Sequence, residues 1–169
     1  MSTVSPFPDE QIEALARLLG ECGTGSEISR ALDNCGLVDK SGQSTKWRRL
    51  HWVFHESQKQ YQCANHVLHF IGSFLRPVRF AGQSDVFEMH RRDLNVILAF
   101  SGLEYGPDGN FRQRGVAKTL DEAERRAQTI QAKFRGRRIH PEVLKYCRAE
   151  LLQDNYFHAV FEATKGLAQ

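Results

Sequence analysis

Positively charged side chains gather in the middle of the sequence, where they could contact the phosphates of a nucleic acid. Two basic and seven acidic side chains give residues 1–39 a net charge of −5, whereas residues 40–92 carry +6 and residues 93–139 carry +3. Lysine and arginine neutralise phosphates whatever the base sequence. We therefore predict RNA or DNA binding, with an uneven but merely solvated charge distribution as the alternative. The candidate contacts are Lys46, Arg48, Arg49, Arg76, Arg79, Arg135, Arg137 and Arg138.

Arg125 and Arg126 could extend this basic surface. They follow Asp121 and Glu122 at helical spacing, however, so ion pairing along one helix is the alternative.

Several histidines have spacings that suit a metal site. His51 and His55 are four residues apart, and Cys63, His66 and His69 follow at intervals of three, so one helix face could gather two or three ligands. The string HWVFH lacks the glutamate of an HExxH metalloprotease motif. Core histidines with satisfied hydrogen bonds are the alternative, and we predict no metal and no other cofactor.

The cysteines show no pairing pattern. None of the four forms a CxxC motif, and a chain without an export signal keeps its thiols reduced. We therefore expect small apolar core residues at Cys22, Cys35, Cys63 and Cys147.

The composition is that of a globular protein. Of 169 residues, 41% are hydrophobic and 25% charged, which excludes disordered and collagen-like classes. No apolar run approaches the ~20 residues that span a bilayer. The first segment carries Asp9, Glu10 and Glu13 where a secretory signal would be basic. We expect a soluble, cytoplasmic protein with no membrane partner.

Hydrophobic periodicity predicts an essentially all-α fold. Start and stop signals place helices at 9–20, after a capping box at Thr24–Glu27, from Ser44 or Thr45 through Phe54, at 64–75, and from Ser84 or Asp85 to about Phe100. A second capping box, Thr119–Glu122, opens a helix that runs to Phe134, and two final helices cover 143–152 and 155–168. The turn-forming residues 106–110 separate Leu103–Tyr105 from Phe111–Arg112 and predict a small β-hairpin.

These elements suggest three parts of the chain. Residues 1–82 would form a helical N-terminal domain, residues 83–138 a long helix with the hairpin and a basic helix, and residues 139–169 a helical pair. The segment 24–54 invites comparison with a helix-turn-helix, but its connection of about nine residues exceeds the usual three or four.

The last predicted helix is apolar on more than one face. Tyr156, Val160 and Ala163 form one stripe, and Phe157 and Phe161 form another. A surface helix needs only one apolar stripe of about 100°. We therefore expect partners on two sides of this helix, and a second copy of the chain could supply one of them as a homodimer.

The C-terminal segment resembles a known family. Ile139–Leu144, Cys147–Leu152 and Asn155–Gly166 look like the opening of the Ymh-type family of uncharacterised bacterial proteins, which is similar to the HEPN superfamily. The residues Thr24–Ile28 and Ser44–Leu50 resemble the helical region that precedes such modules in abortive-infection proteins. The resemblance implies a dimeric four-helix bundle and, in active members, metal-independent RNA cleavage by an Arg-x(4–6)-His motif.

That motif lies beyond the matched segment in the family, so no catalytic residue carries over to this chain. Arg48 and Arg49 match the spacing with His55, but in the N-terminal region. There, histidine could move a proton and arginine could stabilise phosphate charge. We assign no catalytic residue, and a small ribonuclease using this pair remains an alternative.

We therefore expect the nucleic-acid-sensing or regulatory part of a bacterial anti-phage protein associated with a HEPN-like ribonuclease. A helical oligomerisation or partner-binding module without a nucleic-acid role is the alternative.

Overall fold

The computed structural model describes residues 3–127, most of which are helical. The elements are α1 (Asp9–Glu21), α2 (Gly25–Asn34), α3 (Lys46–Tyr61), α4 (Asn65–Phe74), the 3-10 helix η1 (Pro77–Phe80), α5 (Ser84–Ala99), β1 (Leu103–Tyr105), β2 (Phe111–Gln113) and α6 (Leu120–Ala127). The mainly helical fold with one small antiparallel hairpin confirms the predicted fold class at this level. The predicted helices over 143–152 and 155–168 lie outside the described residues.

The predicted capping signals form to different extents. At the start of α2, the amide of Glu27 donates to Thr24 Oγ1 at 3.3 Å, and the amide of Thr24 donates back to Glu27 Oε2 at 2.8 Å, which confirms the first capping box. Before α6 only half of the second box forms. Glu122 N donates to Thr119 Oγ1, whereas the Glu122 carboxylate accepts from the amide of Lys118 instead of Thr119.

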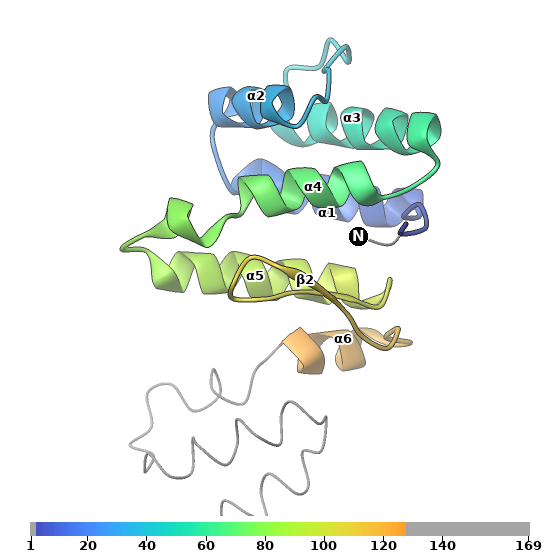
Figure 1. The fold of residues 1–169 in the computed structure, drawn as a ribbon, viewed down its shortest axis with the longest axis vertical. Helices are drawn as coiled ribbons and strands as arrows, with labels where there is room; N and C mark the ends of the chain where they lie inside the picture. Colours follow the sequence, from blue (N-terminus) through green and yellow to red (C-terminus); the bar gives the residue numbers. More distant parts are fainter. Residues whose placement is uncertain (1–2, 128–169) are drawn as a thin grey trace, which may run out of the picture. The chain divides into compact units, whose positions relative to one another are not determined.

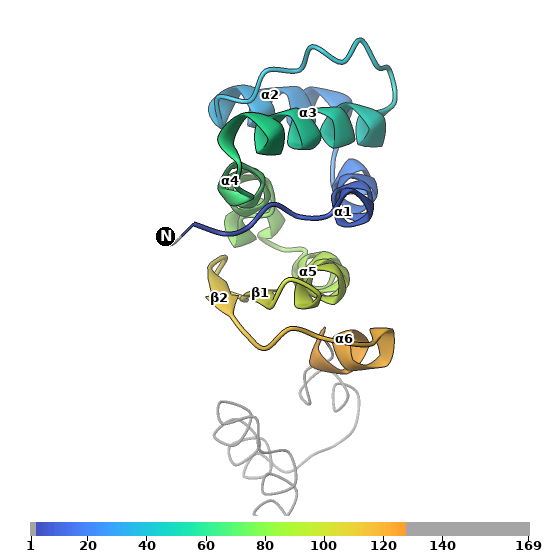
Figure 2. The same cartoon turned by 90° about the vertical axis from the view of Figure 1, so that its right-hand side faces the viewer.

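The elements of this unit are stacked in successive levels (Figures 1 and 2). α2 and α3 lie at one end, followed by α1 and α4, then α5 with the hairpin, and then α6. The main hydrophobic core runs from Phe7 to Tyr105 and includes residues on both sides of position 82, whereas Ala123 of α6 packs with Ala99 and Ala117 in a second, smaller cluster. Residues 1–127 form one compact unit.

Close packing of α1 on α3 depends on a glycine. A Cβ at Gly20 would lie 3.3 Å from the backbone nitrogen of Trp47, so any larger side chain would push the two helices apart. The guanidinium of Arg17 then covers the Trp47 ring at 3.9 Å from its centroid. Since α1 supports α3 in this way, the opposite side of α3 is left for the connection from α2.

The N-terminal segment is fastened to α3 and α4 by buried hydrogen bonds. The Gln58 side chain accepts from the amide of Phe7 at 2.9 Å and donates to its carbonyl at 3.0 Å. Val4 adds a bond from its amide to Asn65 Oδ1 at 2.8 Å. Gln58 is one of the few buried polar side chains in the described part, and both its amide oxygen and its amide nitrogen form a hydrogen bond.

The hairpin is held on α5 by one asparagine. Asn95 Oδ1 accepts from the amide of Tyr105 at 2.6 Å, and Asn95 Nδ2 donates to the Tyr105 carbonyl at 3.0 Å. The buried Tyr105 hydroxyl donates to the carbonyl of Leu75 at 2.9 Å, which joins the hairpin to the end of α4.

Two details differ from the prediction. α3 continues past Phe54 to Tyr61 and ends where Gln62 adopts a left-handed conformation with φ of 53°. The connection between α2 and α3 comprises the eleven residues 35–45, longer than the nine expected, so the structure offers no helix-turn-helix there. Within residues 3–127, no helix combines the length and the apolar character needed to cross a membrane.

Candidate functional site

Arg49, predicted to contact phosphates, instead holds the α2–α3 connection in place. Its Nε donates to Asp39 Oδ2 at 2.6 Å, and its Nη2 donates to Ser29 Oγ at 2.8 Å. Both partners of the ion pair keep only 18% of their side-chain surface exposed. Burial alone would raise the pKa of Asp39, but hydrogen bonds from Ser41 and Arg49 lower it below its usual value.

Two more of the predicted contacts are also used inside the fold. Lys46 Nζ donates to the carbonyl of Gly23 at 3.2 Å, at the start of α2. The Arg79 guanidinium lies 4.4 Å from the Phe74 ring centroid and pairs with Glu27 Oε1 at 3.1 Å. Hydrogen bonds from Thr24 lower the pKa of Glu27, and the positive charge of Arg79 lowers it further by a smaller amount.

Arg48 and Arg76 remain exposed to solvent. Neither forms a salt bridge within the described residues, although the guanidinium of Arg48 lies 5.4 Å from the Trp47 ring centroid. Arg48 and Arg76 therefore stay available as phosphate contacts. The other predicted contacts, Arg135, Arg137 and Arg138, lie outside residues 3–127.

The charge of the folded unit is balanced. Residues 1–127 contain sixteen basic and sixteen acidic side chains, so the net charge of +3 lies in residues 128–169. Arg126 pairs with Glu122 as the alternative interpretation expected, whereas Arg125 Nε donates to the backbone carbonyl of Asp121 at 3.4 Å. A neutral unit does not by itself attract a polyanion.

The histidines of α3 are paired with carboxylates and do not gather around a metal. His51 Nε2 lies 3.2 Å from Asp9 Oδ1, and His55 Nδ1 lies 3.4 Å from Glu56 Oε1. In the part of the chain described, no three histidine, cysteine or acidic side chains could share a metal ion. Arg49 points away toward Asp39, so it does not join His55 in a catalytic pair.

Three cysteines of the folded unit are free thiols. Cys22 is buried as expected, and burial raises its pKa to about 12. Cys35 and Cys63 are only half-buried, and Cys147 lies outside the described residues.

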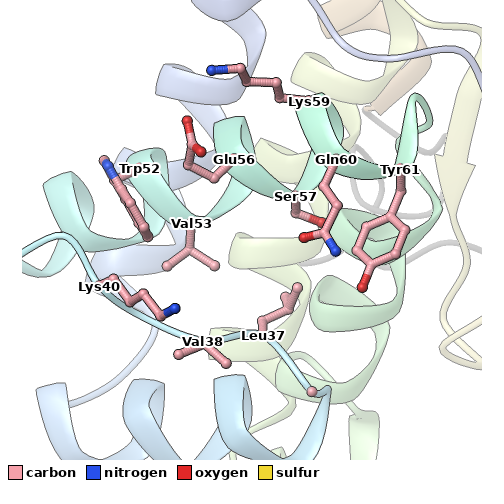
Figure 3. A pocket seen from close by; sticks show the side chains of 11 residues that line it. Leu37, Val38, Lys40, Trp52, Val53, Glu56, Ser57, Lys59, Gln60 and Tyr61 are labelled. Atoms are coloured by element: carbon pink, nitrogen blue, oxygen red, sulfur yellow. The ribbon is translucent and has the colours of Figure 1, made fainter.

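A pocket of about 530 Å³ opens between α3 and the start of the α2–α3 connection (Figure 3). Trp52 stands at one end and Tyr61 at the other, while Leu37 and Val38 face α3 across the opening. Trp52 and Tyr61 are nine positions apart in α3, which corresponds to about 14 Å along the helix axis. The volume is in the range of small-molecule sites, and the lining is divided about evenly between polar and apolar side chains.

The floor of this pocket contains an unsatisfied hydroxyl. Ser57 is 5% exposed, and its Oγ has no hydrogen-bond partner within the described residues. A buried hydroxyl without a partner destabilises a folded protein by about 1–3 kcal/mol. Gln60, three residues further along α3, also lines the pocket, so two side chains that can donate and accept hydrogen bonds share this face of the helix.

The charged side chains that line the pocket point in different directions relative to α3. Figure 3 shows the Lys40 side chain extending between the connection and α3, whereas Glu56 and Lys59 project from the other side of α3. In the described structure Lys40 forms no salt bridge, while Glu56 lies beside His55. The residues that line the pocket carry two ammonium groups, Lys40 and Lys59, and one carboxylate, Glu56, so the lining has a net charge of +1.

Next to the pocket, Tyr61 contacts His66, the second side chain of the described residues that has a buried polar atom without a hydrogen-bond partner. Its ring stacks on His66 with centroids 3.8 Å apart. His66 Nδ1 is buried and, among the residues described, has no hydrogen-bond partner. The stack fixes the end of α3 and with it the Tyr61 wall.

Sequence reasoning missed Lys40, Trp52, Ser57 and Tyr61 as a group. Trp52, Ser57 and Tyr61 share α3 with the predicted basic residues, but no motif links them. The pocket exists because the Asp39–Arg49 ion pair draws the connection toward α3, and such a contact between distant residues leaves no periodic signal. The one sequence feature that could have indicated the pocket is the long polar connection of residues 35–45 before a helix that carries Trp52 and Tyr61.

Comparison with known proteins found a match to a protein family in the C-terminal segment. Residues 137–169 match the model of a family described as "Protein of unknown function (Hypoth_ymh)", and this segment lies outside residues 3–127. Neither the curated proteins nor the solved structures yielded a match. The C-terminal segment is thus similar to an uncharacterised Ymh-type family, as the sequence predicted.

Proposed function

We propose that the folded unit of residues 1–127 is a regulatory module that binds a ligand in the pocket between α3 and the α2–α3 connection. The observation that carries this proposal is the buried Ser57 hydroxyl, which has no hydrogen-bond partner among residues 3–127 and lies on the floor of a 530 Å³ pocket. A side chain that destabilises the empty protein becomes favourable once a ligand satisfies its hydrogen bond.

The module would regulate the C-terminal segment. Residues 137–169 are similar to the Ymh-type family, and we propose, from the resemblance of that family to HEPN bundles, that this segment belongs to a HEPN-like region of a cytoplasmic bacterial anti-phage or abortive-infection protein. In that arrangement residues 1–127 sense a signal, and a HEPN-like bundle, formed with a second copy of the chain, responds to it.

Binding can be tested on the full chain by two-dimensional NMR of the Trp52 indole N–H. The probes are 2-naphthoate and adenosine monophosphate as planar anions, decanoate as an aliphatic anion, and 2-naphthalenemethanol as a planar neutral molecule. We expect at least one probe to shift the Trp52 signal saturably. A Trp52 signal that responds to none of them would refute the proposed function.

A pocket-filling variant provides the specificity control. Val38 is 65% exposed at the pocket, and Val116 is 59% exposed elsewhere, so Val38→Trp and Val116→Trp introduce the same ring at matched positions. Val38→Trp should abolish the Trp52 response, and Val116→Trp should preserve it. Regulation further predicts that the bound probe changes hydrogen exchange in residues 137–169.

A nucleic-acid role is the second candidate, and the charge distribution favours residues 128–169 for it. The chain's net charge of +3 lies there, together with Arg135, Arg137 and Arg138. Arg48, Arg76 and Arg79 are the exposed predicted contacts of the folded unit, and of these Arg79 is paired with Glu27. Fluorescence anisotropy of a labelled single-stranded RNA tests this role, and absence of binding at low salt would exclude it.

A further inference from the structure

We infer that the pocket takes a planar aromatic anion, a flat ring that carries a phosphate or carboxylate group. This inference rests on the proposed function and specifies the chemistry of the ligand. It follows from three features of the pocket: its aromatic rings, the polar groups of Ser57 and Gln60, and the net positive charge of its lining, to which Lys40 contributes the ammonium that extends between the connection and α3.

The rings and aliphatic walls favour a flat, apolar body. Trp52 and Tyr61 close the two ends of the pocket, and Leu37, Val38 and Val53 line it between them. Tyr61 is held by its stack on His66 at 3.8 Å, so the wall at this end is already formed before a ligand binds. Stacking of a ligand ring on such a side chain contributes about 1–3 kcal/mol.

The polar groups favour a ring edge with hydrogen-bonding atoms. Ser57 Oγ is unpartnered within the described residues, and Gln60 lines the pocket three residues further along the same helix. A hydroxyl and an amide can each donate and accept a hydrogen bond. A purely aliphatic ligand would leave Ser57 as unsatisfied as it is in the empty pocket.

The charge favours an anion. Lys40 extends between the connection and α3, and no carboxylate pairs with it in the described structure. The connection that carries Lys40 is fixed one residue earlier, where Asp39 binds Arg49 at 2.6 Å. The ammonium is therefore presented from an anchored segment, which reduces the entropy lost when a ligand binds.

Isothermal titration calorimetry on the full chain separates this inference from the proposed function. We expect 2-naphthoate or adenosine monophosphate to bind at least about tenfold more tightly than decanoate and 2-naphthalenemethanol, which corresponds to one charge-assisted hydrogen bond. Binding of only the phosphate probe would identify a nucleotide-type ligand, and binding of only the carboxylate an aromatic acid. Equal or tighter binding of the aliphatic or the neutral probe would overturn the inference while leaving the pocket a ligand site.

Two variants test the assigned groups. Lys40→Ala should weaken binding of the planar anion about tenfold without affecting the neutral probe, whereas Lys118→Ala, which removes an exposed lysine remote from the pocket, should leave both unchanged. Ser57→Ala should weaken the planar anion severalfold. If the Lys40→Ala and Ser57→Ala proteins both bind as the wild type does, the assignment of the ligand class is wrong.

Discussion

At the scale of single residues, the pocket contains a buried hydroxyl without a hydrogen bond among the described residues, and beside it the connection is held by an ion pair with several hydrogen bonds. Ser57 has a buried hydroxyl with no partner among the described residues, and Arg49 joins Asp39, Ser29 and Gly25 in one network. Structural stability explains the Arg49 network completely. It does not explain Ser57, which is why we associate Ser57 with a ligand.

Removal of the Ser57 hydroxyl should stabilise the empty protein. Alanine fills the same helix position without an unsatisfied polar group and has a higher helix propensity. We expect Ser57→Ala to raise the free energy of unfolding by about 1 kcal/mol in urea denaturation. Ser29→Ala is the matched control, because it removes a hydroxyl that accepts from Arg49, and it should lower stability by about 1 kcal/mol. A loss of stability in Ser57→Ala would show that its hydroxyl has a structural role.

The Asp39–Arg49 pair should make stability depend on pH. Because the folded-state pKa of Asp39 is lowered, its contribution is present above its unfolded pKa of about 3.9 and is lost as the pH falls through the folded value. Asp39→Asn should therefore destabilise the protein at pH 7, and the difference from wild type should shrink below about pH 4. Denaturation between pH 7 and pH 3 checks this, with the exposed Asp33→Asn as control. A difference that is constant with pH would contradict it.

At the scale of secondary-structure elements, local signals in the sequence predicted most of the fold. The Thr24–Glu27 capping box and the hairpin around residues 106–110 form because short-range hydrogen bonds and turn propensities determine them. The second capping box forms only in part, since Glu122 bonds Lys118 and also pairs with Arg126. Local sequence signals could not predict the ion pairs of Arg49 and Arg79, because their partners Asp39 and Glu27 are 10 and 52 residues away in sequence.

The connection from α5 to the hairpin depends on Gly102. Its φ is +64°, and a Cβ there would lie 2.8 Å from the carbonyl oxygen of Arg114. Gly82 also has a positive φ, +82°, but no atom lies within 4 Å of its virtual Cβ. Gly102→Ala should therefore reduce the free energy of unfolding by about 1–3 kcal/mol more than Gly82→Ala does. Equal losses in thermal denaturation would show that only backbone conformation matters at Gly102.

Asn95 determines whether the hairpin stays on α5. Replacing it with alanine leaves the buried amide of Tyr105 without its side-chain partner, while the Tyr105 carbonyl keeps only the longer bond from Arg91 Nη1 at 3.4 Å. We expect Asn95→Ala to lose about 1–3 kcal/mol of stability, because one buried backbone donor becomes unsatisfied. Asn34→Ala at the exposed end of α2 should change stability little. Protection of the Tyr105 amide from hydrogen exchange in Asn95→Ala would contradict this role.

At the scale of the whole molecule, the charge that suggested nucleic-acid binding is not in the folded unit. Residues 1–127 are neutral, and the net positive charge lies in the segment that includes Arg135, Arg137 and Arg138. If the chain binds single-stranded RNA through these three arginines, their replacement with alanine should reduce the slope of log affinity against log salt by about 2. An unchanged slope would show that the RNA contacts lie elsewhere.

The central claim, that the pocket on α3 is a ligand site, is tested most directly by ligand-linked stability of the full chain. The ligand used is the probe that binds most tightly in calorimetry, and at concentrations about 100-fold above its dissociation constant a ligand that binds only the folded state stabilises it by about 2.7 kcal/mol. We predict this gain in urea denaturation of the wild type and of Val116→Trp, and none in Val38→Trp. No gain in the wild type, or an equal gain in Val38→Trp, would contradict the claim.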